Sequence, residues 1–357
     1  VYSYDVLNRL RIDTVFKAAG TAPYWNQTNP TNWLSEYTYD PNGNILSLTR
    51  QTGTALIDNL TFGIPTASWS STNRLDHIDD VVGSGTVAYD IDDQGAANYD
   101  YYANGNLKKD LENNIASGAI LWTNANQVKS ITQGTASKLE YFYDATGNRV
   151  MKKYYEPYTT LAKTTWYVRD AMGNALATYE KTAAGSLQLV ERPMYGASRV
   201  GVDQLVRTYT TNTVTDHDTL YSRDLYNKAY EVSDHLGNVR VTLSDLVVQS
   251  GTYFAGDVLS AVDYYPYGMP IPERTEYQAS YRYGFNTQER ADEISGDGNH
   301  NTAMFWEYDT RAARRWNVEP LIEKYPSFSS YLVFANNPIL FADLDGKDVI
   351  VLAHGHR

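Results

Sequence analysis

Residues 141–150 read YFYDATGNRV, and this arrangement recurs along the chain. Two tyrosines occupy alternate positions, an Asp follows the second Tyr, and Gly and Asn come three and four residues after the Asp. Alternate residues of a strand point to one face of a sheet, and aromatic residues favour strands. Each copy therefore predicts a strand that ends in a tight turn. The other copies read YSYDVLNRL (2–10), YTYDPNGNI (37–45), YDYYANGNL (99–107), VRDAMGNAL (168–176) and VSDHLGNVRV (232–241).

The Asp and the Gly of the repeat are residues that suit a tight turn. An Asp side chain can accept a hydrogen bond from the backbone N–H two residues further on, and Gly adopts the positive φ that hairpin turns need. Because short β-prone runs such as ILSLT (45–49) follow the turns, each copy predicts a hairpin. The predicted turn residues are Asp40 and Gly43, Asp144 and Gly147, Asp170 and Gly173, and Asp234 and Gly237.

The spacing of the repeats predicts how the hairpins assemble. The repeat glycines stand at 43, 105, 147, 173 and 237, and three of the four gaps are close to multiples of about 21 residues. A single hairpin cannot bury its own apolar face, so successive hairpins must stack side by side. We predict an all-β fold, a coiled hairpin-repeat sheet, rather than a β-sandwich or a propeller with blades of about 40 residues. Helical periodicity is almost absent, and the best helical candidate is a short stretch at 311–315.

Composition excludes several classes of protein. The 357 residues include 31 Tyr, more than the 24 Gly, and 42% hydrophobic residues, enough for a large core. The net charge of −12 disfavours nucleic acids and anionic membranes as partners. The absence of Cys excludes a disulfide scaffold, Cys-ligated zinc and a Cys nucleophile, and no apolar run is long enough to predict a membrane span. Since Val1 opens a strand-like run without a preceding Met or signal segment, we expect the sequence to be a piece of a longer protein.

The repeat and five motif blocks of the last third resemble the YD-repeat family, also called rearrangement-hotspot (Rhs) proteins. This family includes the C component of insecticidal toxin complexes and, more distantly, teneurins. The wording of the last blocks is most similar to that of Bacteroidetes members. The blocks are DHLGNVRVTLSD (234–245), YYPYGMPI (264–271), YRYGFNTQERADEISGDGN (281–299), FWEYDTRAARRWNVEPL (305–321) and YPSFSSYLVFANNPILFADLDGKD (325–348).

The resemblance implies a C-terminal part of a shell that encapsulates and delivers a C-terminal polymorphic toxin. Residues 1–230 would be YD-repeat shell wall, 231–347 the repeat-associated core that ends in a plug, and 348–357 the start of the variable toxin region. The implied partners are the chain's own N-terminal shell, the toxin and a secretion apparatus, and the implied location is secreted or on a bacterial cell surface. Because family shells are longer, we expect this chain alone to form an open strip.

The resemblance also implies an aspartyl-type autoprotease, in which two carboxyl groups share a proton and activate water. Glu307 and Glu319 match the catalytic positions, and the cut would fall between Lys347 and Asp348. This chain departs from the family pattern, with Glu in place of Asp at both positions, Trp306 in place of Arg, and Leu344 in place of Pro. The other core-motif positions that the resemblance assigns are Tyr308, Asp309, Arg314, Arg315, Pro320, Asn336, Asn337, Pro338, Asp343, Asp345 and Gly346.

A structural interpretation of the same residues competes with catalysis. The extra methylene of Glu can displace a carboxylate by more than the roughly 0.5 Å tolerance of a preorganised site. In the structural alternative, Glu307, Asp309, Arg314, Arg315 and Glu319 form a salt-linked plug around Trp306 and Trp316. The sequence favours this alternative over self-cleavage.

Glycan binding is a further function that competes with the shell. Exposed aromatic rings such as those of Trp25 and Trp33 could stack on sugars in a glycan-binding adhesion module. His354 and His356 lack a third ligand, so we predict a solvent-facing tail there and no metal site. No nucleophile-elbow, phosphate-loop or zinc-protease motif occurs, so no cofactor is predicted. The paired tyrosines are interpreted as wall residues, while Tyr24 and Tyr158 stay open as contact residues.

Overall fold

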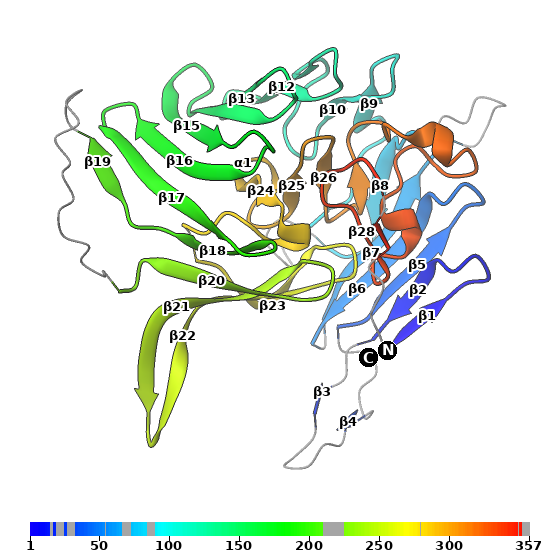
Figure 1. Ribbon diagram of the computed structural model, residues 1–357. Coiled ribbons are helices and arrows are strands. Elements are labelled where there is room, and N and C mark those ends of the chain that lie inside the picture. Colours follow the sequence, from blue (N-terminus) through cyan, green and yellow to red (C-terminus); the bar gives the residue numbers. More distant parts are fainter. Residues whose placement is uncertain are drawn as a thin grey trace.

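Antiparallel hairpins follow one another along most of the chain, as the repeat predicts (Figure 1). The computed structural model describes residues 1–14, 17–18, 25–26, 33–53, 55–65, 73–83, 90–209, 225–278, 280–348 and 350–351. The predicted all-β class is confirmed, because the only α-helix among these residues is α1 (Asp292–Ser295). None of the described helices is long and apolar enough to cross a membrane.

Three antiparallel sheets form what we call the wall. The first has the strand order β1-β2-β5-β6-β7-β8, a two-stranded sheet follows, and the third has 13 strands, nearly all in sequence order. The strands of the first two sheets are β1 (Tyr2–Tyr4), β2 (Leu10–Asp13), β5 (Ser35–Tyr39), β6 (Ile45–Thr52), β7 (Ala55–Gly63), β8 (His77–Asp80), β9 (Tyr99–Tyr101) and β10 (Leu107–Asp110). The strands of the third are β11 (Ile120–Trp122), β12 (Val128–Gln133), β13 (Ser137–Tyr143), β14 (Arg149–Tyr155), β15 (Leu161–Arg169), β16 (Ala175–Thr182), β17 (Leu187–Tyr195), β18 (Arg199–Asp203), β19 (Arg207–Tyr209), β20 (Lys228–Ser233), β21 (Val239–Ser250), β22 (Tyr253–Tyr264) and β23 (Pro270–Glu276).

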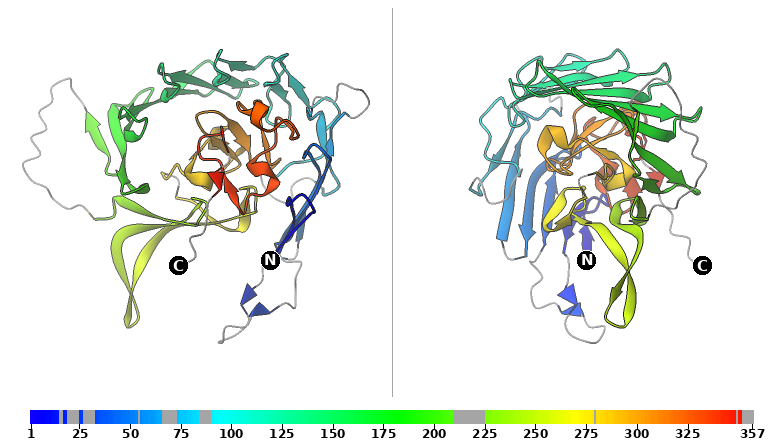
Figure 2. Two further views of the ribbon diagram at one scale, coloured as in Figure 1. Left: turned by 45° about the vertical axis from the view of Figure 1, so that its right-hand side comes forward. Right: turned by 90° about the vertical axis from the view of Figure 1, so that its left-hand side faces the viewer.

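Residues 281–348, here called the inner segment, lie inside the curve of the wall (Figure 2). A small four-stranded sheet with the order β24-β25-β26-β27 forms part of this segment. Its elements are η1 (Phe285–Thr287), β24 (Glu289–Arg290), α1, β25 (His300–Thr302), β26 (Glu307–Asp309), β27 (Arg314–Arg315), η2 (Ile322–Lys324), η3 (Phe334–Asn336) and β28 (Phe341–Ala342). The remaining short strands are β29 (Ile350–Val351), which pairs with β28, and β3 (Lys17–Ala18) and β4 (Trp25–Asn26), which pair with each other.

The helix predicted at 311–315 is wrong. Asp309 Oδ1 accepts hydrogen bonds from the backbone N of Arg311 at 2.9 Å and of Ala312 at 3.3 Å. Ala313 has a φ of +51°, which a helix does not allow. The carboxylate therefore stabilises a turn that leads into β27, in place of a helical turn.

The wall curls until its last part meets its first part. Tyr265 Oη donates a hydrogen bond to the carbonyl of Gln51 at 2.7 Å, and Thr52 Oγ1 donates to Glu273 at 3.0 Å. Ile57 packs in one buried cluster with Tyr265, Met269 and Ile271. These contacts are made by side chains, and no β-ladder joins the two ends among the described residues. The predicted open strip is thus not a closed barrel, but it folds back on itself.

Tyrosine hydroxyl groups join neighbouring hairpins at the edge of the wall where the repeat turns lie. In four cases the tyrosine just before a turn donates to the carbonyl of the residue that follows the turn of the preceding hairpin, whereas Tyr102 donates to the carbonyl of Ile120 at the start of β11. Phe could not form these bonds, which is a physical reason for the Tyr excess. The bonds run from Tyr39 to Leu10 at 2.5 Å, Tyr102 to Ile120 at 2.9 Å, Tyr143 to Val128 at 2.7 Å, Tyr195 to Ala175 at 3.0 Å and Tyr264 to Val239 at 3.1 Å.

Apolar side chains from the concave face of the wall pack against the inner segment. The largest cluster joins Tyr37 and Leu48 of the first sheet to the aromatic rings of the inner segment. A second cluster joins Ile131 and Leu139 of the third sheet to Ile294 and Trp316. Burial of these faces stabilises the curl, because an isolated hairpin has nothing to cover its apolar side.

Candidate functional site

Each repeat turn is closed by its Asp. Asp40 Oδ1 accepts a hydrogen bond from the backbone N of Asn44 at 2.8 Å, and Gly43 has a φ of +85°. The side-chain oxygens of Asp144, Asp170 and Asp234 also accept from the backbone N two and four residues further on. The glycines of those turns have φ values of +90° at Gly147, +89° at Gly173 and +81° at Gly237.

The inner segment binds carbonyl groups that the repeat turns expose at one end of the wall. Asn336 Nδ2 donates to the carbonyl of Gly43 at 2.7 Å, Asn337 Nδ2 to that of Asn8 at 3.0 Å, and Tyr331 Oη to that of Gly105 at 2.7 Å. A Cβ on residue 43 would lie 2.8 Å from Asn336 Nδ2. Gly43 is thus needed both for the turn and for the approach of the inner segment, which sequence reasoning missed. Pro338, next to these asparagines, is buried as well.

Glu307 lies in a buried polar cluster. Its Oε2 is 3.0 Å from His300 Nε2, its Oε1 accepts a hydrogen bond from Thr302 Oγ1 at 3.0 Å, and Arg149 Nη2 lies 3.6 Å away. The ring of His300 meets Trp316 edge-on at 4.5 Å between centroids. These contacts connect β25 and β26 to β14 of the wall.

Glu319 lies in a different network from that of Glu307. It pairs with Arg315 and accepts a hydrogen bond from the backbone N of Leu321 at 2.9 Å. Burial raises the pKa of the Glu319 carboxyl, although Arg315 opposes this shift. The buried guanidinium of Arg315 also donates to the carbonyl of Phe305 at 3.1 Å and to that of Gly346 at 2.8 Å. Arg315 therefore links Glu319 to the peptide that precedes Lys347. The adjacent Pro320 is exposed.

Residues 343–348, which we call the exit loop, are held tightly between β28 and β29. Asp343 Oδ1 accepts hydrogen bonds from the backbone N of Gly346 at 2.7 Å and of Lys347 at 3.1 Å. The backbone N of Phe305 donates to the carbonyl of Asp345 at 2.9 Å. Asp348 pairs with Lys324 at 2.8 Å and accepts from Tyr325 Oη. Gly346 has a φ of +84°, and a Cβ there would lie 2.7 Å from the ring of Trp306.

The remaining residues of the predicted salt-linked plug do not join one network. Asp309 pairs with Arg311 at 2.8 Å, and this cation outweighs burial, so that the pKa of Asp309 is lowered. Arg314 donates to the carbonyl of Asn73 and lies over the ring of Tyr331 at 4.6 Å. Among the five residues proposed for the plug, the ion pair that forms is Arg315–Glu319.

The exit loop makes the stability of the protein dependent on pH. Burial raises the pKa of Asp343 to about 7, against the effects of Arg315 and the N–H of Gly346. A carboxyl whose pKa is raised by folding binds its proton more tightly in the native state, so its contribution to stability increases as pH falls through 7 and levels off near 4. The free energy of unfolding of the unmodified chain should therefore rise as the pH is lowered from 8 to 5 and Asp343 binds its proton. We expect this rise to be smaller by about 2 kcal/mol in Asp343→Asn.

Urea unfolding at several pH values measures this effect. Asp345→Asn is the matched control, because Asp345 lies in the same loop and is exposed. Glu289, whose pKa is lowered to about 2, stays ionised throughout this pH window and does not contribute. An unchanged pH dependence in Asp343→Asn would contradict the assignment.

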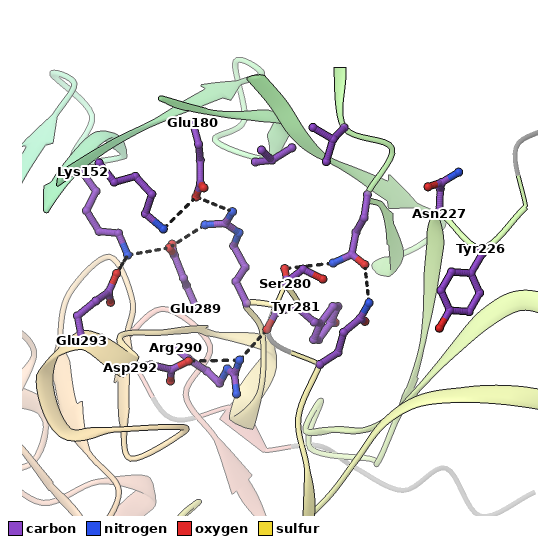
Figure 3. A pocket seen from close by; sticks show the side chains of 16 residues that line it. Lys152, Glu180, Tyr226, Asn227, Ser280, Tyr281, Glu289, Arg290, Asp292 and Glu293 are labelled. Atoms are coloured by element: carbon purple, nitrogen blue, oxygen red, sulfur yellow. Dashed lines mark hydrogen bonds and ion pairs between the residues drawn. The ribbon is translucent and has the colours of Figure 1, made fainter. Parts of the chain in front are cut away.

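A cavity of about 540 Å³ lies between the inner segment and the charged part of the wall (Figure 3). Lys152 pairs with Glu293 at 2.9 Å and with Glu289 at 3.9 Å, and Arg282 lies 3.6 Å from Glu289. Burial would raise the pKa of Glu289, but Lys152 and the neighbouring arginines lower it to about 2. The concave face of β14–β17 is therefore polar. The first sheet packs mainly apolar side chains against the inner segment, with one buried ion pair between Arg50 and Asp58 at 2.8 Å.

Among the candidate sugar-stacking residues, the ring of Trp33 is described by the structure, and other side chains cover it. The ring of Trp33 packs against the cluster of Ile57, and Arg274 lies over it at 5.0 Å. Tyr158 is exposed, whereas Tyr24, the side chain of Trp25, and His354 and His356 lie outside the described residues.

Comparison with known proteins relates the fold to solved structures of Tc toxin complexes. No protein-family profile matches the chain. Salivary gland surface protein 1 of Aedes aegypti is 28% identical over 222 residues, which are 60% of this chain and 6% of that protein. The crystal structure of TcdB2-TccC3-Cdc42 matches 97% of this chain with a TM-score of 0.63 at 16% identity. The Photorhabdus luminescens Tc holotoxin pore with a mutated TccC3 matches 100% with a TM-score of 0.61 at 15% identity.

A third structure, TcdB2-TccC3-TEV, matches 97% of the chain with a TM-score of 0.53 at 15% identity. The chain spans about 15% of the length of these three solved chains. At such identities the likeness concerns the fold. The chain thus shares its fold with a part of these TcdB2-TccC3 and Tc holotoxin chains.

Proposed function

We propose that the chain is the C-terminal part of an Rhs-type shell that encloses a C-terminal polypeptide toxin and delivers it to competing cells. Its partners are the preceding shell wall, the toxin that follows and a secretion apparatus, and its location is outside the producing cell or on its surface. In this proposal residues 1–230 serve as wall, 231–347 as core and plug, and the toxin begins at residue 348.

The observation that carries this proposal is the position of the inner segment. The wall curls around residues 281–348, and the side chains of Asn336, Asn337 and Tyr331 attach them to the turn carbonyls at one end. Residues 350–351 pair with β28, so the chain passes from the exit loop along the inner segment. A segment fixed in this way can close one end of a shell and hold the start of the cargo.

Protection from proteases tests the proposal. In a longer polypeptide that carries this segment, we expect the residues after 351 to resist trypsin at concentrations that digest the same residues expressed alone. The double variant Asn336→Ala/Asn337→Ala should accelerate their digestion at least tenfold, because it removes two bonds between the inner segment and the turns. The control is Asn124→Ala at an exposed turn. Equally fast digestion of the enclosed and isolated residues would contradict the proposal.

Self-cleavage between Lys347 and Asp348 is a second candidate function, favoured by the carboxyl groups at the exit loop. Glu319 and Asp343 both have raised pKa values, and each contributes to the raised pKa of Tyr325 beside Asp348. In this mechanism the protonated Asp343 would donate a proton to the leaving amine while the ionised Glu319 activates water. The contacts of Glu307 are with other residues, so its pairing with Glu319 gains no support.

Intact-mass measurement decides between cleavage and a purely structural loop. If the site is active, the purified 357-residue chain separates into residues 1–347 and 348–357, and Glu319→Gln or Asp343→Asn prevents this. Glu307→Gln is the comparison that tests the pair implied by the family resemblance. A single intact species after prolonged incubation between pH 5 and pH 8 excludes the reaction.

A further inference from the structure

The hairpin of β21 and β22 extends beyond the wall (Figures 1 and 2). β20 pairs with β21 only as far as Leu243, and β23 pairs with β22 only from Ala261 onward. Between these limits the two strands pair with each other, from Val247 opposite Gly256 to Ser250 opposite Tyr253. We call residues 244–258 the ribbon. Both of its outer edges carry backbone groups without a strand partner among the described residues.

The ribbon is apolar and uncharged where it is most exposed. Tyr253 is 77% exposed, Phe254 74% and Val247 68%. No charged residue occurs from 246 to 256, although 20% of the chain is Asp, Glu, Lys or Arg. Asp257 stands at the base, where it accepts a hydrogen bond from Ser244 Oγ at 2.9 Å. Natural sheets protect such edges with charges, Pro or bulges. The register shift of this hairpin lies at its base, between Leu243 and Val247, so the outer part of the ribbon is an unprotected apolar edge and hence a pairing surface.

We infer that the ribbon pairs edge to edge with the ribbon of a second copy of this chain. A partner strand would cover the apolar side chains and form hydrogen bonds with the unpaired backbone groups. A lipid surface would accept the side chains but leave the backbone groups of both edges unsatisfied.

Charge identifies a second copy as the occupant. A two-fold antiparallel pairing places residues of one ribbon opposite the same stretch of the other. Such pairing fails wherever like charges meet, and residues 246–256 contain none. The two bodies, each with a net charge of −12, repel each other, and the projecting ribbon lets them associate at a distance.

The exposed area predicts a weak and reversible dimer. A fully buried aromatic side chain covers about 150–250 Å². The exposed parts of Tyr253, Phe254 and the valines of one ribbon therefore amount to roughly 500 Å², and two copies reach about 1,000 Å², the lower limit of specific interfaces. Because the bodies repel each other, the dimer should be stronger at high salt.

Sedimentation velocity on the intact chain tests the pairing. We expect a monomer at about 1 μM and a growing dimer fraction toward about 100 μM, larger in 500 mM than in 150 mM NaCl. The double variant Val247→Lys/Phe254→Lys should weaken the dimer at least tenfold. Met172→Lys, at an 86% exposed position on a repeat turn, is the control. Circular dichroism checks that each variant is folded.

A monomer at every concentration and salt level overturns the inference, and so does a dimer that the lysine variants leave intact. Ribbon-dependent binding to phosphatidylcholine vesicles by a chain that stays monomeric would overturn it in favour of a lipid surface.

Cross-linking locates the paired edge. The chain contains no Cys, so Val248→Cys and Ala255→Cys each introduce one thiol, on β21 and on β22. Under diamide, one of the two variants should form a disulfide-linked dimer at least tenfold faster than Met172→Cys. Equal rates in all three variants would contradict pairing through the ribbon.

Discussion

Replacement of Arg315 by Met is expected to lower the free energy of unfolding by about 3 kcal/mol or more. The guanidinium is fully buried and bonds to Glu319 and to the carbonyls of Phe305 and Gly346. Met fills a similar volume but leaves the carbonyl of Gly346 without the donor from Arg315 and the carboxylate of Glu319 without its cation. The carbonyl of Phe305 keeps its hydrogen bond from Asn317 Nδ2 at 2.6 Å. The exit loop loses one of its anchors, so the amides of residues 346–348 should also exchange with deuterium faster.

Urea unfolding at pH 7 measures the effect, and Lys324→Met provides its control. The pair between Lys324 and Asp348 is 56% and 43% exposed at its two side chains, so its loss should cost less than about 1 kcal/mol. If Arg315→Met cost no more than Lys324→Met, Arg315 would not be an anchor of the exit loop.

The change Phe334→Ala should lower the free energy of unfolding by about 3–5 kcal/mol. The ring of Phe334 lies at the centre of an aromatic cluster, 5.7 Å from Trp306, 5.9 Å from Tyr308 and 6.5 Å from Tyr267 between centroids. Alanine would leave a cavity that these rigid rings cannot fill, because they are already fixed by contacts with each other. Phe334 belongs to the buried cluster that joins the inner segment to Tyr37 and Leu48 of the first sheet, so its loss should weaken that junction.

A matched control is Phe328→Ala, since Phe328 is 38% exposed and stacks on Tyr325 alone among the described rings. It should cost less than about 2 kcal/mol. Thermal unfolding followed by near-ultraviolet circular dichroism reports on the aromatic cluster directly. Equal costs for the two variants would show that the cluster does not support the inner segment.

The strands could be predicted from the sequence because their signals are local. Alternating tyrosines and the Asp and Gly of each turn act within about ten residues, and β13 and its turn at Asp144 follow this pattern. The prediction of a helix at 311–315 failed for a local reason as well. The side chain of Asp309 accepts a hydrogen bond from the backbone N of Arg311 and stabilises a turn in place of a helix.

The candidate site could be predicted only in part, because its contacts join distant residues. Asn336 contacts a turn 293 residues away, and Arg315 reaches the carbonyl of a residue 31 positions further on. The family resemblance paired Glu307 with Glu319, yet Glu307 contacts His300 and Thr302 whereas Glu319 contacts Arg315. Polar residues at inward positions of the wall, such as Lys152 and Glu191, were a visible signal for the charged cavity, but their partners in 281–293 could not be read from the pattern.

The tyrosine hydroxyl bonds have a consequence for how such proteins change over time. Each phenol connects a hairpin to its immediate neighbour, so duplication or deletion of one hairpin leaves the other connections intact. One added hairpin lengthens the strip by two strand spacings, about 10 Å. The wall can therefore be lengthened in small steps through rearrangement of the gene while the hydroxyl bonds between the remaining neighbouring hairpins stay unchanged.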